Sequence, residues 1–273
     1  MTPEAIRRLA DELAEAYAHG RMIAAPPSAR DPRFDLATAY AVEAELVRQR
    51  RARGRTTVGR KVGFANKAMW RILKLDTLAW AHMYDDTVRY AERDQATWSV
   101  AGRCAPKIEP EIVCKLTRPI APGNADPAAI LDAVEWLALG FEVNDCVFPD
   151  WTFQPADFVA AFGFHTALVV GTPRPVDASN IAALVEALRA FTVTLSKDGE
   201  FVEEGSGKNA LRSPALCLGE LAGAIERQGA DPLAAGELIS TGTLTTPQPV
   251  AAGQSWRAEV TLLDLPALTL QFN

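Results

Sequence analysis

The sequence has no apolar run long enough to cross a membrane, and it contains few cysteines. The four that it has, Cys104, Cys114, Cys146 and Cys217, lack the paired spacing of a metal site, so we expect reduced core thiols. Thr2-Pro3-Glu4 leads directly into an amphipathic helix rather than into an apolar signal core. These absences predict a cytoplasmic protein that makes no membrane contact.

Several familiar catalytic and binding motifs are also missing. The chain has no Gly-x-Ser-x-Gly turn, which disfavours a serine hydrolase, and no dinucleotide fingerprint after a first strand. Gly205-Ser206-Gly207-Lys208 resembles a phosphate-binding loop only superficially, because the first glycine is not at the required spacing. The net charge is −6, with acidic and basic residues interleaved, so no nucleic-acid partner is expected.

The first third of the chain is predicted to be mainly helical. One helical pattern covers residues 3–19 and ends at Gly20, and Asp35 caps a second pattern that continues to residue 53. A strand is expected over residues 56–64, followed by a short helix over residues 67–73 that Asn66 caps. We interpret residues 1–55 as an N-terminal helical part and residues 56–273 as a catalytic domain.

The remainder is predicted to be rich in strands, with Asp198-Gly199 as a hairpin turn. Helices are expected over residues 128–139, 181–189 and 214–227. Strands are expected over residues 108–116, 140–145, 166–170, 191–196, 201–204, 238–241, 257–262 and 268–272. Strands mixed with helices and hairpins indicate a mixed α/β (α+β) fold around a rolled or barrel-like sheet.

Glu109 and Glu111 are the most informative residues, because they lie one residue apart on a predicted strand. Side chains alternate across a strand, so both carboxylates project from the same face. Two like charges held that close repel unless a cation or a proton lies between them. A hard divalent cation such as Mg²⁺ would meet this need, whereas the alternative is a solvated edge strand with two exposed acids.

Glu142 favours the cation. It lies on an apolar segment, residues 141–148, that follows the predicted helix over residues 128–139. A strand–helix–strand order brings neighbouring strands together, so Glu142 is a candidate third ligand beside Glu109 and Glu111. Three carboxylates together with water and a chelating substrate would form an octahedral Mg²⁺ or Mn²⁺ site. The alternative for Glu142 is a salt bridge with an arginine or lysine.

Arg60 and Lys61 are adjacent on a predicted strand, so they point to opposite faces. We expect Lys61 to face the carboxylates, where it would bind a substrate carboxylate or move a proton, and Arg60 to face away. A lysine that is buried beside a metal is expected to have a lowered pKa. The alternative is that Lys61 lies at the surface.

The chain resembles the 2-keto-4-pentenoate hydratase and 4-oxalocrotonate decarboxylase branch of the fumarylacetoacetate hydrolase superfamily, over nearly its whole length. The E-x-E strand with a downstream acid is the most specific element of this resemblance. The matching segments are Ala39-Tyr40, Gly59-Arg60-Lys61-Val62-Gly63-Phe64, Ile108-Glu109-Pro110-Glu111-Ile112, Phe141-Glu142-Val143-Asn144-Asp145, Asp150-Trp151 and the C-terminal run over residues 236–245.

The resemblance implies a β-roll like the C-terminal domain of fumarylacetoacetase, with flanking helices. It also implies that Glu109, Glu111 and Glu142 bind Mg²⁺ or Mn²⁺, and that Lys61 takes the place of the lysine near the family's first strand. Three residues in or directly beside the matching segments, Arg60, Asp145 and Thr243, are candidate substrate-binding residues.

The sequence departs from the family pattern where many members have Ala-Asp-Asn, because it has Ala160-Ala161-Phe162-Gly163-Phe164-His165 there. Cys146-Val147 replaces the usual Ser-Arg, and Leu265-Pro266 replaces the usual Leu-Gly. We expect residues 162–165 to make one wall of the site more apolar. His165 is the only titratable side chain in this stretch and is therefore a candidate catalytic acid or base, although a structural role is the more common one for such a histidine.

The resemblance implies a lyase that adds water to a 2-hydroxy-2,4-dienoate derived from aromatic compounds. The alternatives are a decarboxylase of the 4-oxalocrotonate type, an acylpyruvate C–C hydrolase and a non-catalytic partner subunit. The expected ligand is a small 2-oxo or 2-hydroxydienoic acid. The expected assembly is a homo-oligomer, with a complex with a related pathway enzyme as a further possibility.

Overall fold

The computed structural model describes all residues, 1–273, and begins with helices α1 (Pro3–His19), α2 (Pro27–Arg30) and α3 (Leu36–Ala52). The Thr2 hydroxyl accepts a hydrogen bond from the backbone N–H of Ala5, and α1 ends at Gly20, whose φ is 55°. The Asp35 carboxylate caps α3 by accepting a hydrogen bond of 2.8 Å from the backbone N–H of Thr38. The structure therefore confirms both long N-terminal helices, and local capping explains where they begin.

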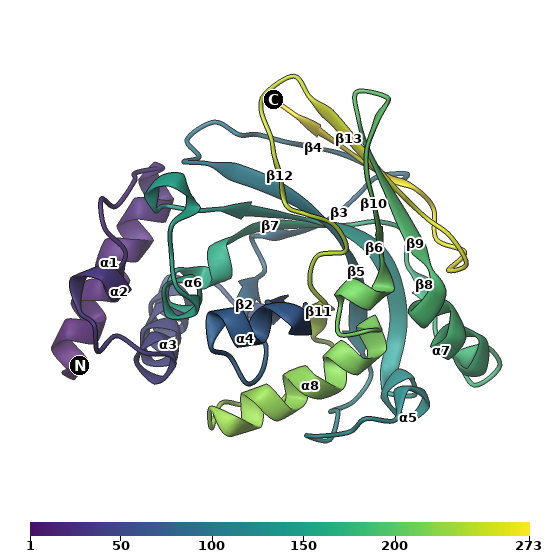
Figure 1. Ribbon diagram of the computed structural model, residues 1–273, viewed down its shortest axis with the longest axis horizontal. Coiled ribbons are helices and arrows are strands. Elements are labelled where there is room, and N and C mark those ends of the chain that lie inside the picture. The colour runs from purple at the N-terminus through teal and green to yellow at the C-terminus, as the bar shows by residue number, and fades with distance from the viewer.

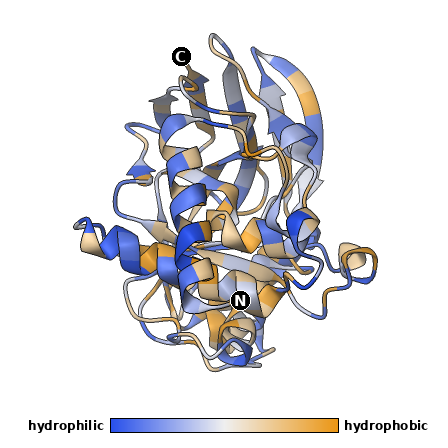
Figure 2. Ribbon diagram, turned by 90° about the vertical axis from the view of Figure 1, so that its left-hand side faces the viewer, coloured by the Kyte–Doolittle hydropathy of each residue, from blue (hydrophilic) through white to orange (hydrophobic).

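The N-terminal helices share a hydrophobic core with a later part of the chain. Helices α1 and α3 pack together, and α3 also packs against α6 (Pro155–Ala160). A cluster of 22 buried residues joins these helices to residues 146–164. Figure 2 shows both hydrophilic and hydrophobic residues along these helices, as amphipathic helices require. The boundary between residues 55 and 56 stays a prediction.

Two sheets, with further helices packed against them, form the rest of the molecule (Figure 1). The larger sheet has nine strands: β1 (Thr57–Gly63), β2 (Ala79–Tyr84), β3 (Val88–Tyr90), β5 (Pro106–Leu116), β6 (Val134–Asp145), β7 (His165–Val170), β8 (Arg174–Pro175), β11 (Leu238–Ser240) and β12 (Gln248–Pro249). The main path runs β2-β1-β11-β5-β6-β7-β3. The smaller sheet has the order β10-β9-β13-β14-β4, formed by β4 (Gln95–Trp98), β9 (Thr192–Lys197), β10 (Glu200–Ser206), β13 (Ser255–Val260) and β14 (Leu268–Phe272).

The main core contains 46 buried residues contributed by both sheets and by the remaining helices. These helices are α5 (Pro127–Leu131), α7 (Ile181–Ala190) and α8 (Pro214–Arg227), and they contact one another along the lower part of Figure 1. A short helical stretch also follows β1, formed by η1 (Lys67–Met69) and α4 (Trp70–Leu73). The mixed fold predicted from the sequence is confirmed.

Several local predictions are confirmed as well. Asp198 and Gly199, with φ of 53° and 86°, connect the antiparallel strands β9 and β10. The side chain of Asn66 accepts a hydrogen bond from the backbone N–H of Ala68 at the start of η1. All four cysteines are unpaired, and all but Cys104 are buried. None of the helices combines the length and the apolar character that crossing a membrane would need.

The helix predicted over residues 128–139 is wrong. Helix α5 ends at Leu131, and residues 134–139 form the first half of β6 instead. Residues 134–139 are apolar and buried except for Glu135, and periodicity cannot distinguish such a buried strand from a buried helix. Gly140 lies inside the strand rather than at a helix end. A glycine fits there because a Cβ would approach the Val113 side chain to 2.6 Å.

Some elements were not predicted. They are α2, α6, three single-turn segments, η2 (Pro149–Trp151), η3 (Phe162–Phe164) and η4 (Gly207–Asn209), and the strands β2, β3, β4, β8 and β12. Most of them are four residues or fewer, too short for a hydrophobic period to show.

Candidate functional site

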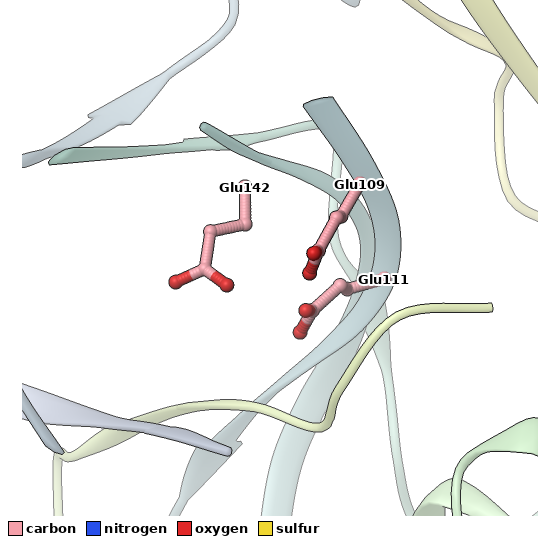
Figure 3. A group of neighbouring side chains, drawn as sticks. All are labelled: Glu109, Glu111 and Glu142. Carbon is pink, nitrogen blue, oxygen red and sulfur yellow. The ribbon is translucent and has the colours of Figure 1, made fainter. Parts of the chain in front are cut away.

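The antiparallel pairing of β5 with β6 sets the geometry of the site. Glu109 lies directly opposite Glu142 in the strand register, and Glu111 follows two residues along the same face of β5. Oxygen atoms from the three carboxylates lie within 4.8 Å of one another. Figure 3 shows the three side chains converging on one space. The two strands therefore bring together the three acids named from the sequence.

Glu111 has a carboxylate oxygen without a partner. Its Oε2 accepts hydrogen bonds from the Ser240 hydroxyl at 2.5 Å and from the backbone N–H of Gly242 at 2.8 Å. Its Oε1 is buried and has no hydrogen-bond partner. A buried polar atom without a partner is costly, so the site favours a ligand at this oxygen. A set of three carboxylates is the donor set that hard divalent cations prefer.

The charges in this group are unequal. Burial raises the pKa of Glu109 to about 7, and burial together with repulsion from Glu142 and Glu109 raises the pKa of Glu111 well above its usual value. Burial also disfavours the charged form of Glu142, but Lys61 and His165 outweigh it and lower the pKa to about 2. Glu142 therefore remains ionised, whereas Glu109 and Glu111 hold protons readily unless a cation replaces them.

Lys61 is buried against these carboxylates. Its ammonium group lies 2.8 Å from Oε2 of Glu142 and donates to the Asn144 side chain at 3.1 Å and to the carbonyl of Gly163 at 3.0 Å. Gly163 has φ of 59°, and a Cβ there would lie 2.8 Å from Cδ of Lys61. The three donors of the ammonium group are thus all directed to oxygen atoms. The ion pair suggested as the alternative role of Glu142 is also present.

Without a bound cation, the pKa of Lys61 is raised. Burial by itself would lower it, but attraction by the three carboxylates outweighs burial and raises the pKa above its usual value. Lys61 is therefore an ammonium group in this arrangement. A lowered pKa would need a cation that neutralises the carboxylates.

Arg60 projects from the other face of β1, as strand alternation requires. Its guanidinium group donates to Glu237 at 2.6 Å and to the carbonyl of Asp231 at 3.2 Å. The Asp145 carboxylate accepts hydrogen bonds from the backbone N–H groups of Cys104 and Ala105. Neither Arg60 nor Asp145 lines the cavity beside the carboxylates, so their role in binding substrate stays a prediction.

His165 lies behind Glu142 rather than beside a ligand. Its Nδ1 is 2.8 Å from Oε1 of Glu142, and its Nε2 is 2.9 Å from the Thr87 hydroxyl. Its side chain is only 1% exposed. His165 does not line the cavity beside the carboxylates, and its contact with Glu142 fits the structural role; a catalytic role stays a prediction.

A cavity of about 530 Å³ opens beside the carboxylates and is lined by Lys61 and Glu109. One wall is aromatic, formed by Phe64, Trp151, Phe153, Phe158 and Phe164. Polar residues, among them Thr243, Thr245 and Asn209, also line the cavity. The structure thus places Thr243 in contact with the cavity. Phe164 contributes the apolar surface expected from residues 162–165.

These features can be compared with known proteins. Residues 81–271 match the family model described as fumarylacetoacetate (FAA) hydrolase C-terminal, which covers more than half of the chain. The chain belongs to the fumarylacetoacetate hydrolase family. A 2-keto-4-pentenoate hydratase from Burkholderia vietnamiensis is 30% identical over 255 residues, covering 93% of each chain. A 4-oxalocrotonate decarboxylase from a Pseudomonas species is 31% identical over 257 residues, covering 93% of this chain and 94% of the relative.

A solved structure of the fumarylacetoacetate hydrolase family agrees over the full length. The 4-oxalocrotonate decarboxylase from Pseudomonas putida G7, complexed with magnesium and adipate, superposes with a TM-score of 0.90 at 25% identity. The match covers 100% of this chain and 99% of the decarboxylase chain. The likeness includes the N-terminal helices, which lie before the part that the family model matches.

Several residues beside the carboxylates were not predicted from the sequence. Asn144 bonds both Lys61 and Glu142, and its position two residues after Glu142 on one strand was a usable signal. Ser240, which bonds Glu111, lies opposite Lys61 in the register of β11 and β1. Lys107 lines the cavity from the same face of β5 as Glu109.

Proposed function

We propose that this chain is a divalent-metal-dependent lyase that adds water to a short 2-hydroxy-2,4-dienoate. One observation carries the proposal: three converging carboxylates, one with a buried unpartnered oxygen, beside a lysine and a cavity of about 530 Å³. The activities in the names of its relatives, a 2-keto-4-pentenoate hydratase among them, support this substrate class. The intact charged cluster argues against a non-catalytic subunit.

Glu109, Glu111 and Glu142 would hold the cation, with Mg²⁺ or Mn²⁺ as the proposed ion. The magnesium in the related decarboxylase structure supports this choice. When bound, the cation supplies Lewis-acid stabilisation of the negative charge that develops on the 2-oxygen of the substrate. Ser240 and the backbone N–H of Gly242 hold one oxygen of Glu111, which leaves Oε1 free to bind.

Lys61 would bind the substrate carboxylate or transfer a proton to the substrate. Lys61 lines the cavity, and Asn144 and the carbonyl of Gly163 fix the position of its ammonium group. A cation bound at the carboxylates would weaken their attraction for the Lys61 proton, so Lys61 would release it more readily. The aromatic wall limits water around the reacting atoms, and the side with Thr243 and Thr245 offers polar groups to orient one water.

Decarboxylation of a 2-oxo acid of the 4-oxalocrotonate type is the second candidate. The superposition on a 4-oxalocrotonate decarboxylase over the full chain favours it. The same carboxylates would serve both reactions, because each develops negative charge on the 2-oxygen. What differs is whether a water or a leaving carboxylate occupies the cavity.

A substrate panel tests these proposals. The purified protein would receive Mg²⁺ or Mn²⁺ with 2-hydroxypenta-2,4-dienoate or 4-oxalocrotonate, and products would be followed by ultraviolet absorbance and by CO₂ release. Formation of a 4-hydroxy-2-oxo acid supports hydration, and release of CO₂ supports decarboxylation. Cleavage of an acylpyruvate into two acids would instead identify a C–C hydrolase. No turnover of any substrate with either metal would contradict the lyase proposal.

We predict that Lys107→Met raises KM more than it lowers kcat. Lys107 lines the cavity, makes no ion pair, and lies 4.1 Å from the centre of the Trp151 ring. A charge-assisted bond to an anionic substrate is worth about 2 kcal/mol, so KM should rise roughly tenfold or more. Lys115→Met is the matched control, because Lys115 lies on the same strand but pairs with Glu135. An unchanged KM in Lys107→Met would exclude this contact.

We also predict that His165→Asn weakens metal binding. The imidazole holds Oε1 of Glu142, and loss of such supporting partners typically costs about 10- to 100-fold in metal affinity. Titration calorimetry with Mn²⁺ would measure the change. His82→Asn is the control, since His82 pairs with Glu43 instead. Unchanged metal affinity in His165→Asn would leave His165 with a packing role only.

We further propose a cytoplasmic location and a homo-oligomeric assembly. The relatives include enzymes, which supports a soluble protein. The lack of a helix that could cross a membrane agrees with this. Light scattering of the purified protein would give the mass of the assembly. A monomer at micromolar concentration would contradict the proposed homo-oligomer.

A further inference from the structure

Arginines line a second cavity of about 310 Å³. It lies on the side of Glu142 where His165 contacts that carboxylate. Four arginines line it: Arg50, Arg53, Arg89 and Arg103. They come from three separate segments, namely the end of α3, strand β3 and the loop before β5. The net charge of the whole chain is −6, so this local excess of positive charge is not a consequence of composition.

The charge in this cavity is not neutralised by the protein. Asp86 is the one acidic residue in the lining, and it already pairs with Arg50 and with Arg55. Arg53, Arg89 and Arg103 make no ion pair. The Nε atoms of Arg50 and Arg103 are buried without a hydrogen-bond partner. Arg53 and Arg89 are exposed, whereas Arg50 and Arg103 are half-buried. Buried donors without partners are costly and the lining carries an excess of positive charge, so this arrangement favours an anion.

Two of the guanidinium groups are held in place by aromatic rings. Arg50 lies 4.2 Å from the centre of the Tyr84 ring, and Arg103 lies 5.4 Å from that of Trp98. Stacked guanidinium groups lose less freedom when they bind an oxyanion, and their planar donors match phosphate and carboxylate geometry. The cavity is thus partly organised for binding before a ligand arrives.

His165 lines this cavity and connects it to the carboxylate site. Its ring joins Thr87, which also lines this cavity, to Glu142 of the carboxylate site. The two cavities share no lining residue. The second cavity is therefore a separate compartment, and its volume lies at the lower end of the range for small-molecule sites.

We propose that the arginine-lined cavity is a binding site for a small polyvalent anion that carries phosphate or carboxylate groups. Arg89 and Arg103, whose charges have no partner, supply the main contacts, and Arg53 adds a third. The volume of about 310 Å³ favours a small ligand. The proposal does not depend on the reaction catalysed at the carboxylate site.

Titration calorimetry with inorganic phosphate and with succinate tests the proposal, using metal-free protein at constant ionic strength with chloride as the reference anion. We expect saturable binding of at least one of the two anions, and which one binds identifies the ligand chemistry. Arg89→Met and Arg103→Met should each weaken it by about tenfold, as expected for a lost charge-assisted contact. Neither arginine is in an ion pair, so both variants should fold, which circular dichroism would verify.

Two control variants locate the binding. Arg257→Met removes an exposed arginine of β13 that pairs with Glu259, and it should leave anion affinity unchanged. Lys107→Met removes the unpaired cation of the larger cavity, and anion binding should persist in it as well. The proposal is overturned if neither anion binds more tightly than chloride. It is equally overturned if binding survives in both Arg89→Met and Arg103→Met, or disappears in Lys107→Met.

Discussion

Glu111→Gln is expected to abolish most of the affinity for Mg²⁺ and Mn²⁺, by about 100-fold or more, because it removes one of three charged oxygen ligands. Glu111 carries the buried oxygen without a hydrogen-bond partner, Oε1. Turnover at moderate metal concentration should fall with the affinity. Titration calorimetry with Mn²⁺ and steady-state kinetics over a range of Mg²⁺ concentrations would measure both effects.

Thermal unfolding separates this expectation from simple damage to the fold. Burial and repulsion by Glu142 and Glu109 disfavour a charge on Glu111, so the metal-free variant should melt no lower than the unmodified protein. The rise in melting temperature that metal produces should be lost in the variant. Glu135→Gln, at an exposed acid of β6 paired with Lys115, is the matched control and should keep that rise. A variant with full metal affinity would show that Glu111 is not a ligand.

Metal affinity is also expected to depend on pH. The pKa of Glu109 is raised to about 7 by burial, so below neutral pH a proton competes with the cation for this carboxylate. Affinity should therefore fall as the pH decreases from 8 to 6, by up to roughly tenfold per pH unit for one competing proton. Glu109→Gln should bind metal more weakly and show a reduced pH dependence, because the raised pKa of Glu111 leaves one carboxylate that still competes for a proton. A metal affinity independent of pH in the unmodified protein would contradict the assignment.

Lys61→Met is the second change with a large expected effect. It should reduce kcat by about 100-fold or more, which is the usual contribution of a positioned proton donor or acceptor. Without bound metal the variant should also be less stable, because it removes a buried positive charge 2.8 Å from the Glu142 carboxylate. Added Mg²⁺ should restore much of the melting temperature, since it replaces the lost positive charge, but it should not restore kcat.

Arg60→Met is the control for Lys61→Met. Arg60 is equally buried, but it pairs with Glu237 on the other face of β1. Its loss should lower the melting temperature with little change in kcat, and added Mg²⁺ should not reverse that loss. If Arg60→Met reduced kcat while Lys61→Met left it unchanged, the assignment of faces on β1 would be wrong.

The sequence by itself determined the features that depend on neighbouring residues. Side-chain caps at Thr2 and Asp35 fixed where α1 and α3 begin, and Asp198-Gly199 fixed a hairpin. Alternation along one strand placed Glu109 and Glu111 on the same face, because the period of a strand is two wherever that strand lies. The order of the elements made Glu142 a candidate third ligand, strand alternation allowed Lys61 to face the same side, and the family resemblance supported both.

Only the tertiary structure decided how these residues meet. The register between β5 and β6, which sets Glu142 opposite Glu109, depends on packing between strands and is not encoded in either strand alone. The same packing makes residues 134–139 a strand instead of the predicted helix. Burial on both faces removes the alternating pattern that would have indicated a strand from the sequence. Packing between strands also placed His165 behind Glu142, where no spacing along the chain could have located it, since 23 residues separate the two.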